Sequence, residues 1–182
     1  MGNGFGRQTA IIDFGLGNLR SLHHKLTVAG LHARVVTRPA EVLTAPHLIL
    51  PGVGHFGPAM DCLSQTGLAA AIVEAVRTQG TPLLGICLGM QLLTDGSEES
   101  GTSGLGLIPG RTVHLRNGVP SGYPLPHIGW ARVSWRSNQA IDGVVSAPLD
   151  CYFSHSYHVE CEEERVLATS NYGVDFVAGI ID

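Results

Sequence analysis

Apolar residues in the first half of the chain follow two patterns. Short continuous runs, each bounded by glycine, proline or polar residues, predict buried strands at 9–14, 32–36, 47–50 and 82–87. The intervening segments carry apolar residues at helical spacing, which predicts helices at 18–29, 58–64 and 68–79 and a short helical or irregular connection at 39–45. Strands that alternate with helices indicate a doubly wound, parallel α/β sheet, which binds ligands at the carboxyl ends of its strands.

The second half, from residue 94 onward, has a different pattern. A polar loop at 95–104 is followed by short runs typical of strands, which turn residues separate. These strand candidates are 107–115, 128–135, 150–156, 165–170 and 174–181. We therefore expect an antiparallel strand layer added to the parallel sheet, with the three glutamates at 162–164 in a solvated turn.

Length and charge limit the number of domains and the kinds of partner. A chain of 182 residues suffices for one well-packed domain, which we place at 9–182, after a glycine-rich leader at 1–8. The net charge is −4 and the 11 Lys and Arg form no basic cluster, which argues against nucleic acid or an anionic membrane as the main partner. No apolar stretch approaches the roughly 20 residues that a membrane-spanning helix needs.

The cysteines indicate a reducing compartment. They lie at 62, 87, 151 and 161, which is neither a paired secretory spacing nor a zinc-ligand spacing. The first eight residues contain no apolar signal region. Both observations fit the cytoplasm best.

The segment 82–93 contains the first candidate for chemistry. An apolar run leads to Cys87, which has Gly85 two residues before it and Gly89 two residues after it, and a helix-compatible segment follows. This spacing is typical of a nucleophile elbow, in which small neighbours permit a sharp strand-to-helix turn. A thiol at a helix N-terminus is favoured as thiolate. The alternative is a buried structural cysteine, which has no need of flanking glycines.

A second candidate is the glycine-rich loop at 51–57, which follows the strand at 47–50. Its glycines allow the backbone to approach a ligand closely and to direct N–H groups into a cleft, as an oxyanion hole requires. An ordinary glycine-rich turn is the alternative. Both this loop and Cys87 lie at carboxyl ends of predicted strands, where such a sheet binds ligands.

Two further patterns carry weaker hypotheses. Gly15 and Gly17 suggest a dinucleotide-binding fingerprint, but Arg20 stands where the third glycine belongs, so a tight turn is the better interpretation. A zinc site would need four side chains that come from one stretch of chain, Cys151, His155, His158 and Cys161. In an extended strand residue 158 has the opposite parity to 151 and 155, which argues against zinc.

Taken together, these segments resemble the class I glutamine amidotransferases, and within them the glutaminase subunits of imidazole glycerol phosphate synthase. The resemblance runs from about residue 10 to 182. The Gly-Ile-Cys-Leu-Gly motif at 85–89 is shared by the wider class, whereas five other segments are similar to this subunit in particular. These segments are 12–21, 51–57, 104–110, 126–130 and 152–157.

The resemblance implies a reaction and a set of roles. Cys87 is the expected nucleophile that attacks the side-chain amide of glutamine, so that ammonia and then glutamate are released, without a metal or other cofactor. The expected oxyanion hole is formed by backbone N–H groups, each worth roughly 3 to 4 kcal/mol, at Gly52, Val53, Gly54 and Leu88. The residues expected to hold glutamine are Gln91, Glu99, Ser156 and Tyr157.

The resemblance also implies a partner and a destination for the ammonia. Members of this family pass ammonia through a channel to a (β/α)₈-barrel cyclase subunit, with which they form a heterodimer that makes imidazole glycerol phosphate in histidine biosynthesis. The residues that resemble the interface with this cyclase are Pro126, His127, Trp130 and Tyr152. The implied fold is flavodoxin-like, with a mainly parallel central sheet and an added antiparallel layer.

The chain departs from the family pattern at its C-terminal end. Family members continue from the strand at 174–181 to a Gln-Phe-His-Pro-Glu segment, whose His is the general base and whose Glu orients it, and to a final helix. This chain contains no His-Pro-Glu sequence. We therefore expect a truncated domain that lacks the final strand and helix and is poorly active, because triad removals cost orders of magnitude in rate. The spacing places none of His55, His127, His155 or His158 beside Cys87 as a substitute.

Two alternatives to a histidine-pathway glutaminase remain open from the sequence. The chain can be a catalytically inactive binding or regulatory partner of the cyclase. It can also be an amidotransferase subunit of another pathway.

Overall fold

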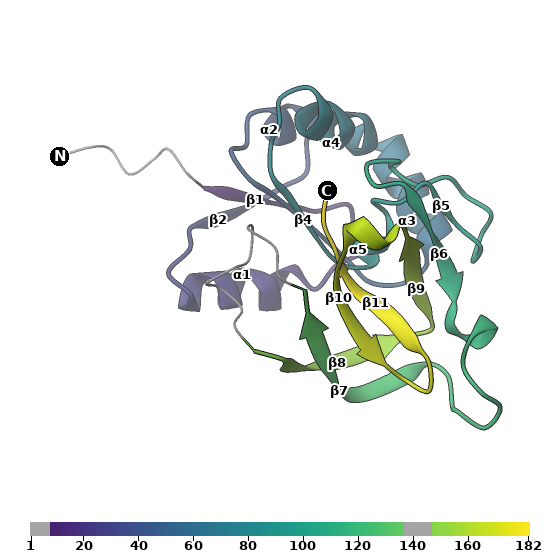
Figure 1. Ribbon diagram of the computed structural model, residues 1–182. Helices are drawn as coiled ribbons and strands as arrows, with labels where there is room; N and C mark the ends of the chain where they lie inside the picture. Colours follow the sequence, from purple (N-terminus) through teal and green to yellow (C-terminus); the bar gives the residue numbers. More distant parts are fainter. Residues whose placement is uncertain (1–7, 137–146) are drawn as a thin grey trace.

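A computed structural model describes residues 8–136 and 147–182, in which two β-sheets pack beside each other with helices mainly around the first (Figure 1). The predicted leader at 1–8 lies outside the described residues except for Gln8. The doubly wound half and the strand-rich half expected from the sequence are both present.

The first sheet is parallel throughout, with strand order β2-β1-β3-β4. Its strands are β1 (Thr9–Ile12), β2 (Ala33–Val36), β3 (Leu48–Gly52) and β4 (Leu83–Cys87). Burial of β1 and β3 from both sides explains their uninterrupted apolar runs. The register between β3 and β4 pairs Gly52 with Cys87, so the glycine-rich loop begins beside the cysteine.

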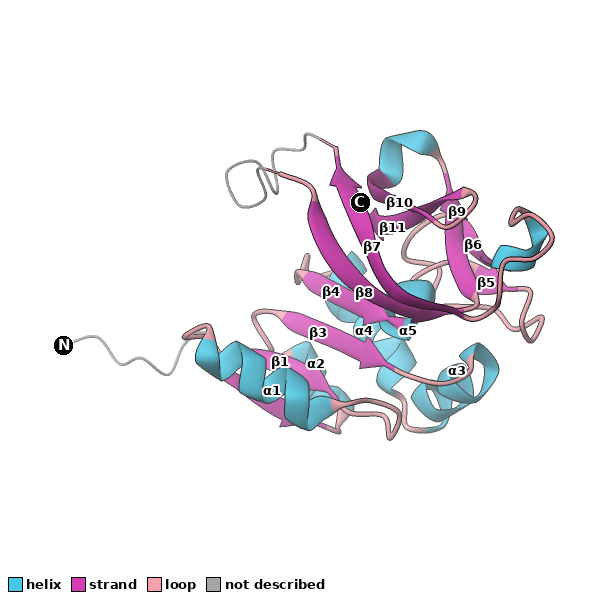
Figure 2. Ribbon diagram, turned by 90° about the horizontal axis from the view of Figure 1, so that it is seen from below, coloured by secondary structure: helices cyan, strands magenta, loops and turns pink. Residues whose placement is uncertain are grey.

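Helices cover both faces of this sheet, as Figure 2 shows, with α1 on one face and α2 and α4 on the other. The helices are α1 (Leu19–Val28), α2 (Pro39–Leu43), α3 (Phe56–Gln65), α4 (Leu68–Arg77) and the short α5 (Leu88–Gln91). The Asn18 side chain accepts a hydrogen bond from the Ser21 N–H, which confirms the local signal for the start of α1. Gly30 follows α1 with φ +76°, a conformation that glycine adopts without strain.

The second sheet has seven strands in the order β5-β6-β9-β11-β10-β7-β8. They are β5 (Gly96–Ser97), β6 (Gly110–His114), β7 (His127–Trp135), β8 (Leu149–His155), β9 (Tyr157–Cys161), β10 (Val166–Asn171) and β11 (Asp175–Ile180). All neighbours pair antiparallel except β5 and β6, so the expected antiparallel layer is confirmed with one parallel pair at its edge. The sequence prediction missed β5 and β9.

Two 3₁₀ turns complete the described chain. The first, η1 (Leu115–Asn117), follows β6, and the second, η2 (Glu163–Arg165), occupies most of the glutamate-rich segment that was expected to be a solvated turn. No described residue in η2 is buried, in agreement with that expectation.

The main apolar core lies against the first sheet. It joins strand residues such as Ile12 and Leu50 to Phe56 of α3 and Ile72 of α4, all fully buried. A smaller cluster around Leu115 and Phe176 lies in the second sheet. Burial of this apolar surface is the dominant favourable contribution to folding. It also fixes the positions of β3 and β4, whose ends carry the candidate site.

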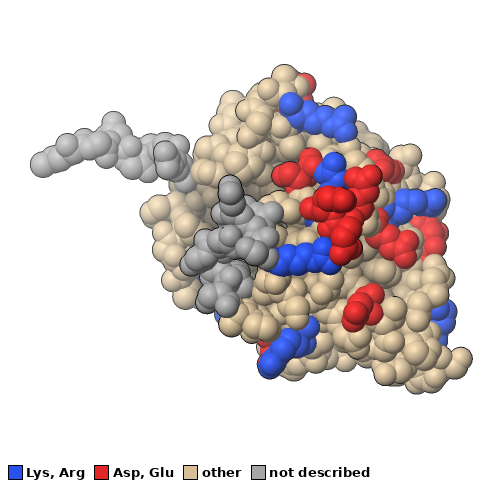
Figure 3. All heavy atoms as spheres, in the orientation of Figure 1, with Lys and Arg blue, Asp and Glu red and all other residues tan. Residues whose placement is uncertain are grey.

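Charged side chains of both signs are interspersed on the face seen in Figure 3. Several form ion pairs within the second sheet and its turns, including Arg132 with Asp150 at 2.9 Å and Arg136 with Glu163 at 2.5 Å. Such exposed pairs contribute little to stability, about 0 to 1 kcal/mol each. Among the described residues, no helix is both long enough and apolar enough to cross a membrane.

Candidate functional site

Cys87 is the last residue of β4 and directly precedes α5. Its backbone has φ 56° and ψ −118°, and it is the one non-glycine residue with positive φ in the described part of the chain. This conformation is sterically unfavourable for a residue with a Cβ and persists only where the surrounding structure enforces it. The side chain is exposed, so the strained turn presents a thiol to solvent, as a nucleophile elbow does.

The glycines around Cys87 are required by close packing. A Cβ on Gly85 would lie 2.8 Å from the backbone of Met90, and a Cβ on Gly89 would overlap the Leu50 carbonyl oxygen. Gly52 is similarly tight, with its hypothetical Cβ 3.1 Å from Gly89 N. The small residues therefore let α5 pack directly on the ends of β3 and β4, which is the physical reason for the Gly-x-Cys-x-Gly spacing.

Cys87 lines two adjoining cavities at this end of the strands. One, of about 340 Å³, lies between β4 and α5 on one side and β8, β9 and β11 on the other. The second, of about 450 Å³, contains most of the residues expected from the sequence, namely Val53, Gly54, Leu88, Gln91, Glu99, Pro126, Ser156 and Tyr157. The structure thus brings together, in one cavity with Cys87, the four side chains that were expected to hold glutamine.

The expected oxyanion-hole residues surround Cys87 but are not all free to act. Leu88 is the first residue of α5, whose first N–H groups have no partner within the helix. In contrast, the Val53 N–H donates to the Leu16 carbonyl at 3.2 Å. The Val53 N–H is therefore engaged outside the site in this conformation, and it must leave Leu16 before it can stabilise an oxyanion.

Glu99 is held by the segment that follows the glycine-rich loop. Its carboxylate lies 2.6 Å from His55 Nδ1 and accepts a hydrogen bond from the Phe56 N–H at 2.8 Å. Phe56 begins α3, so Glu99 accepts from one of the N–H groups that have no partner within the helix. The positive end of the helix dipole also stabilises the negative charge of the carboxylate. A substrate ammonium group would have to share this carboxylate with His55.

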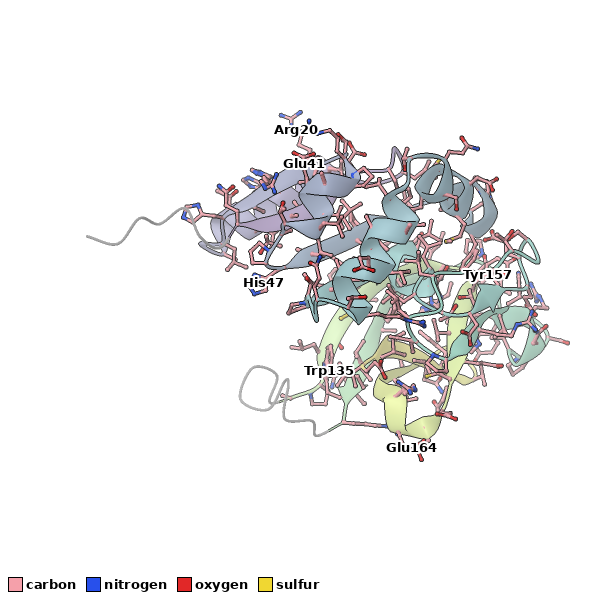
Figure 4. All side chains as sticks on the ribbon, turned by 90° about the horizontal axis from the view of Figure 1, so that it is seen from above. Arg20, Glu41, His47, Trp135, Tyr157 and Glu164 are labelled. Carbon is pink, nitrogen blue, oxygen red and sulfur yellow. The ribbon has the colours of Figure 1, made fainter. Side chains whose placement is uncertain are left out.

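Gln91 and Tyr157 meet across the cavity. Gln91 Nε2 donates to the Tyr157 carbonyl at 3.2 Å, which joins α5 to the beginning of β9. The Tyr157 ring packs edge-on against His114, and burial, followed by the nearby Glu99 and Glu98 charges, raises the pKa of its hydroxyl. In Figure 4, Tyr157 lies on the side of the second sheet that is nearer to the helices, whereas Trp135 and Glu164 lie farther from them.

Three of the four histidines that were considered as a substitute base line a cavity together with Cys87. His155 lines both cavities, His55 lines the larger and His158 the smaller. The sequence did not reveal this because His155 and His158 lie on strands, and His55 on the loop before α3, that are distant from Cys87 in the chain and meet it only in the folded structure. His55 and His155 are nevertheless engaged elsewhere, through Glu99 and the Tyr157 carbonyl respectively.

Three of the histidines lie partly buried in the second sheet: His127 and His155 on the paired strands β7 and β8, and His158 on β9, which β11 and β10 separate from β7. His127 Nδ1 lies 3.1 Å from His155 Nε2, and His158 has a buried Nδ1 without a hydrogen-bond partner. Burial lowers the pKa of all three imidazoles below the ordinary value of 6.5. Within residues 8–136 and 147–182, no three metal-ligating side chains gather as a metal site would require.

Comparison with known proteins assigns the family. The family model described as glutamine amidotransferase class-I matches residues 10–181. The chain belongs to this family. It is 46% identical over 176 residues to the imidazole glycerol phosphate synthase subunit HisH of Moorella thermoacetica, covering 96% of this chain and 81% of that protein. It is also 49% identical over 173 residues to the HisH subunit of Geobacillus thermodenitrificans, covering 92% and 80%.

A solved structure confirms the class I amidotransferase fold. The structure titled PurLQS from Thermotoga maritima superimposes with a TM-score of 0.70 at 16% identity, covering 94% of this chain and 77% of that one. At this identity the likeness concerns the fold alone. The expected flavodoxin-like arrangement with an added strand layer is therefore confirmed for this class I amidotransferase, independently of its substrate.

The residues expected at an interface do not all lie on the surface of this class I amidotransferase. Trp130 and Tyr152 are 73% and 58% exposed, and their rings pack edge-on 5.6 Å apart across β7 and β8. Pro126 is exposed as well. His127 is only 3% exposed, because it stacks between Tyr172 and Phe153, so it cannot contact a partner directly. The exposed aromatic pair remains a predicted interface.

Proposed function

We propose that this class I amidotransferase is the glutaminase subunit of an imidazole glycerol phosphate synthase of histidine biosynthesis. It hydrolyses glutamine to glutamate and ammonia at Cys87 and supplies the ammonia to a (β/α)₈-barrel cyclase subunit, with which it forms a cytoplasmic heterodimer. The similarity to HisH subunits over more than nine-tenths of the chain supports this assignment. The observation that carries the chemistry is the strained, exposed Cys87 in a cavity with Gln91, Glu99, Ser156 and Tyr157.

The reaction takes place in two steps at the thiol. The Cys87 thiol gives its proton to solvent water, and the thiolate attacks the side-chain carbonyl carbon of glutamine. The C–N bond then breaks, and the amide nitrogen takes up a proton from water and leaves as ammonia. Water then attacks the resulting thioester, which releases glutamate and restores the thiol. Backbone N–H groups at Leu88 and in the loop from Gly52 to Gly54 stabilise the oxyanion that forms in each step.

The resting arrangement gives a physical reason for the partner to raise activity. Val53 must exchange the Leu16 carbonyl for the oxyanion, and Glu99 must share its carboxylate with the substrate as well as His55. Both changes belong to segments around the same cavity as Cys87. A partner that favours the rearranged loop therefore increases kcat.

The test is glutamate release by the purified chain, measured alone and with the cyclase subunit and its ligand. We expect slow release, because this sequence contains no His-Pro-Glu segment that would supply a general base. Release should rise when the partner is added and fall to the uncatalysed rate in Cys87→Ala, which removes the nucleophile but keeps the β-carbon. Cys62→Ala is the matched control, since Cys62 lies in α3 outside the cavities that Cys87 lines, and it should retain activity. Equal glutamate release by Cys87→Ala and the unmodified chain would refute the proposal.

A further inference from the structure

The Tyr157 carbonyl is a shared acceptor at the centre of the cavity wall. Two side chains donate to it: Gln91 Nε2 at 3.2 Å, from α5, and His155 Nδ1 at 2.9 Å, from the end of β8. Only Ser156 separates β8 from β9 at this point. The orientation of this one carbonyl is therefore linked both to the corner between two strands and to a residue proposed to hold glutamine.

The contacts of His155 determine which of its nitrogens carries the proton. A carbonyl oxygen only accepts, so His155 Nδ1 must be the donor. Burial lowers the pKa of His155 and outweighs the hydrogen bond to the Tyr157 carbonyl, which raises it, while the neighbouring His127 and His158 act in the same direction as burial. The ring is therefore neutral and Nε2 has a lone pair. His127 Nδ1, 3.1 Å away, is then the donor to Nε2.

His127 is itself held firmly. Its ring stacks on Tyr172 with centroids 4.0 Å apart and on Phe153 at 5.2 Å, and its side chain is almost fully buried. The Tyr172 hydroxyl donates to the Pro124 carbonyl at 2.8 Å. The imidazole of His127 is thus a fixed donor that selects one tautomer of His155.

The hydrogen bond to the Tyr157 carbonyl also fixes the orientation of the Gln91 side-chain amide. Because Nε2 points to the carbonyl, Oε1 of Gln91 remains as the acceptor available to a ligand in the cavity. If the carbonyl turned away, the amide would lose the partner that distinguishes its oxygen from its nitrogen. A misoriented amide would place a donor where a substrate N–H group requires an acceptor.

We propose that His155 is a positioning residue for glutamine binding. By donating from Nδ1 to the Tyr157 carbonyl it holds the corner between β8 and β9, and through that carbonyl it orients the Gln91 amide, while His127 maintains the required tautomer. Both nitrogens of His155 are occupied by these tasks, so it is not the base for Cys87. This inference rests on the proposed glutaminase function.

A pair of substitutions separates the two nitrogens of His155. In His155→Asn the side-chain N–H₂ lies near the position of Nδ1 and can still donate to Tyr157 O. In His155→Gln the longer amide reaches toward the position of Nε2 and serves His127, but the donor to the carbonyl is lost. We expect His155→Gln to raise the KM for glutamine about fivefold, in line with loss of one neutral hydrogen bond, with little change in kcat, and His155→Asn to restore a KM close to the original.

The matched control is His23→Asn on α1, since His23 also bonds a backbone carbonyl, that of Ala33 at 3.1 Å, outside both cavities. This control should not change KM. As a second variant in case the β8 substitutions impair folding, His127→Phe preserves the aromatic stacking and removes the donor to His155, and we expect it to raise KM about threefold. The assay uses the full 182-residue chain with its cyclase partner.

Glutamine protection of Cys87 from iodoacetamide gives a second readout that needs no turnover. The glutamine concentration that halves the alkylation rate should rise in His155→Gln and in His127→Phe, and stay constant in His155→Asn. Equal protection and equal KM in His155→Gln and His155→Asn would overturn the positioning role. The proposed function would fail through a different result. In that case Cys87→Ala, with no substitution at His155 or His127, would still release glutamate.

Discussion

At the scale of single residues, the site depends on one strained backbone position. Cys87 has φ 56° and ψ −118°, and the packing of Gly85 and Gly89 against α5 and β3 leaves no room for a relaxed turn. The exposed Cys87 side chain buries little apolar surface, so it does not itself stabilise this conformation. The packing of the surrounding core residues holds it in place. Reactivity at Cys87 is therefore accompanied by a local cost in stability.

Replacement of Cys87 by glycine tests this cost. Glycine adopts positive φ without a steric penalty, whereas alanine retains the Cβ that causes the strain. We expect Cys87→Gly to have a free energy of unfolding about 1 kcal/mol higher than Cys87→Ala, after subtraction of the entropy that glycine gains in the unfolded chain. Urea unfolding followed by circular dichroism measures the difference, and a Cys87→Gly protein less stable than Cys87→Ala would show that the turn is not strained.

At the scale of elements, three strands of the second sheet carry histidines whose imidazoles are kept neutral. His127 of β7, His155 of β8 and His158 of β9 all have lowered pKa values, chiefly because burial removes water from the charged form. For His158, the carboxylates of Glu160 and Glu98 act in the opposite direction but do not outweigh burial. The second sheet is thus built to hold uncharged imidazoles.

This arrangement predicts a pH dependence of stability. The unfolded chain binds protons on these histidines near the ordinary value of 6.5, whereas the folded chain binds them only at lower pH. Their contribution to stability is therefore complete above about pH 6.5 and is lost as the pH falls toward the lowered pKa values, at up to about 1.4 kcal/mol per pH unit for each neutral histidine.

Urea unfolding at pH 7.5 and 5.5 measures this loss. The matched variant is His158→Gln, which removes one titrating group and should reduce the difference between the two pH values. An unfolding free energy that is the same at both pH values would contradict neutral burial of these residues.

At the scale of the whole molecule, the site lies where two sheets meet. The parallel sheet supplies Cys87 and the glycine-rich loop, and the second sheet supplies Ser156, Tyr157 and the histidines. The exposed aromatic pair of β7 and β8 lies in the second sheet, on the same two strands that carry His127 and His155. A partner that binds those strands is therefore in a position to influence the cavity.

The exposed aromatic pair predicts where such a partner binds. Tryptophan and tyrosine are enriched among the residues that dominate binding energies, and Trp130 has 73% of its surface available for burial. We expect Trp130→Ala to weaken binding of the cyclase subunit by about 2 kcal/mol, or roughly 30-fold in Kd. Titration calorimetry measures this, with Val28→Ala as control because Val28 is equally exposed, at 71%, on α1. Equal affinities of the two variants would place the interface elsewhere.

Much of the first half was predictable from local signals. The apolar runs marked β1 to β4, Asn18 marked the start of α1, and the glycines around Cys87 marked the strained turn. These features depend on residues within a few positions of one another, so periodicity and turn chemistry suffice to find them. The strand β9 was missed because it follows β8 after a single residue, without glycine or proline to signal a turn.

The sequence by itself determined the elements of the parallel half and indicated Cys87 and the residues around it as a candidate site. Only the tertiary structure decided what those residues contact: Val53 bonds to Leu16, Glu99 to His55, and His127 to His155. The latter two contacts join residues 44 and 28 positions apart. Contacts at such separation depend on how strands pair and how the two sheets pack. For His127 and His155, which are paired across β7 and β8, a shift in register by one residue would turn one side chain to the opposite face.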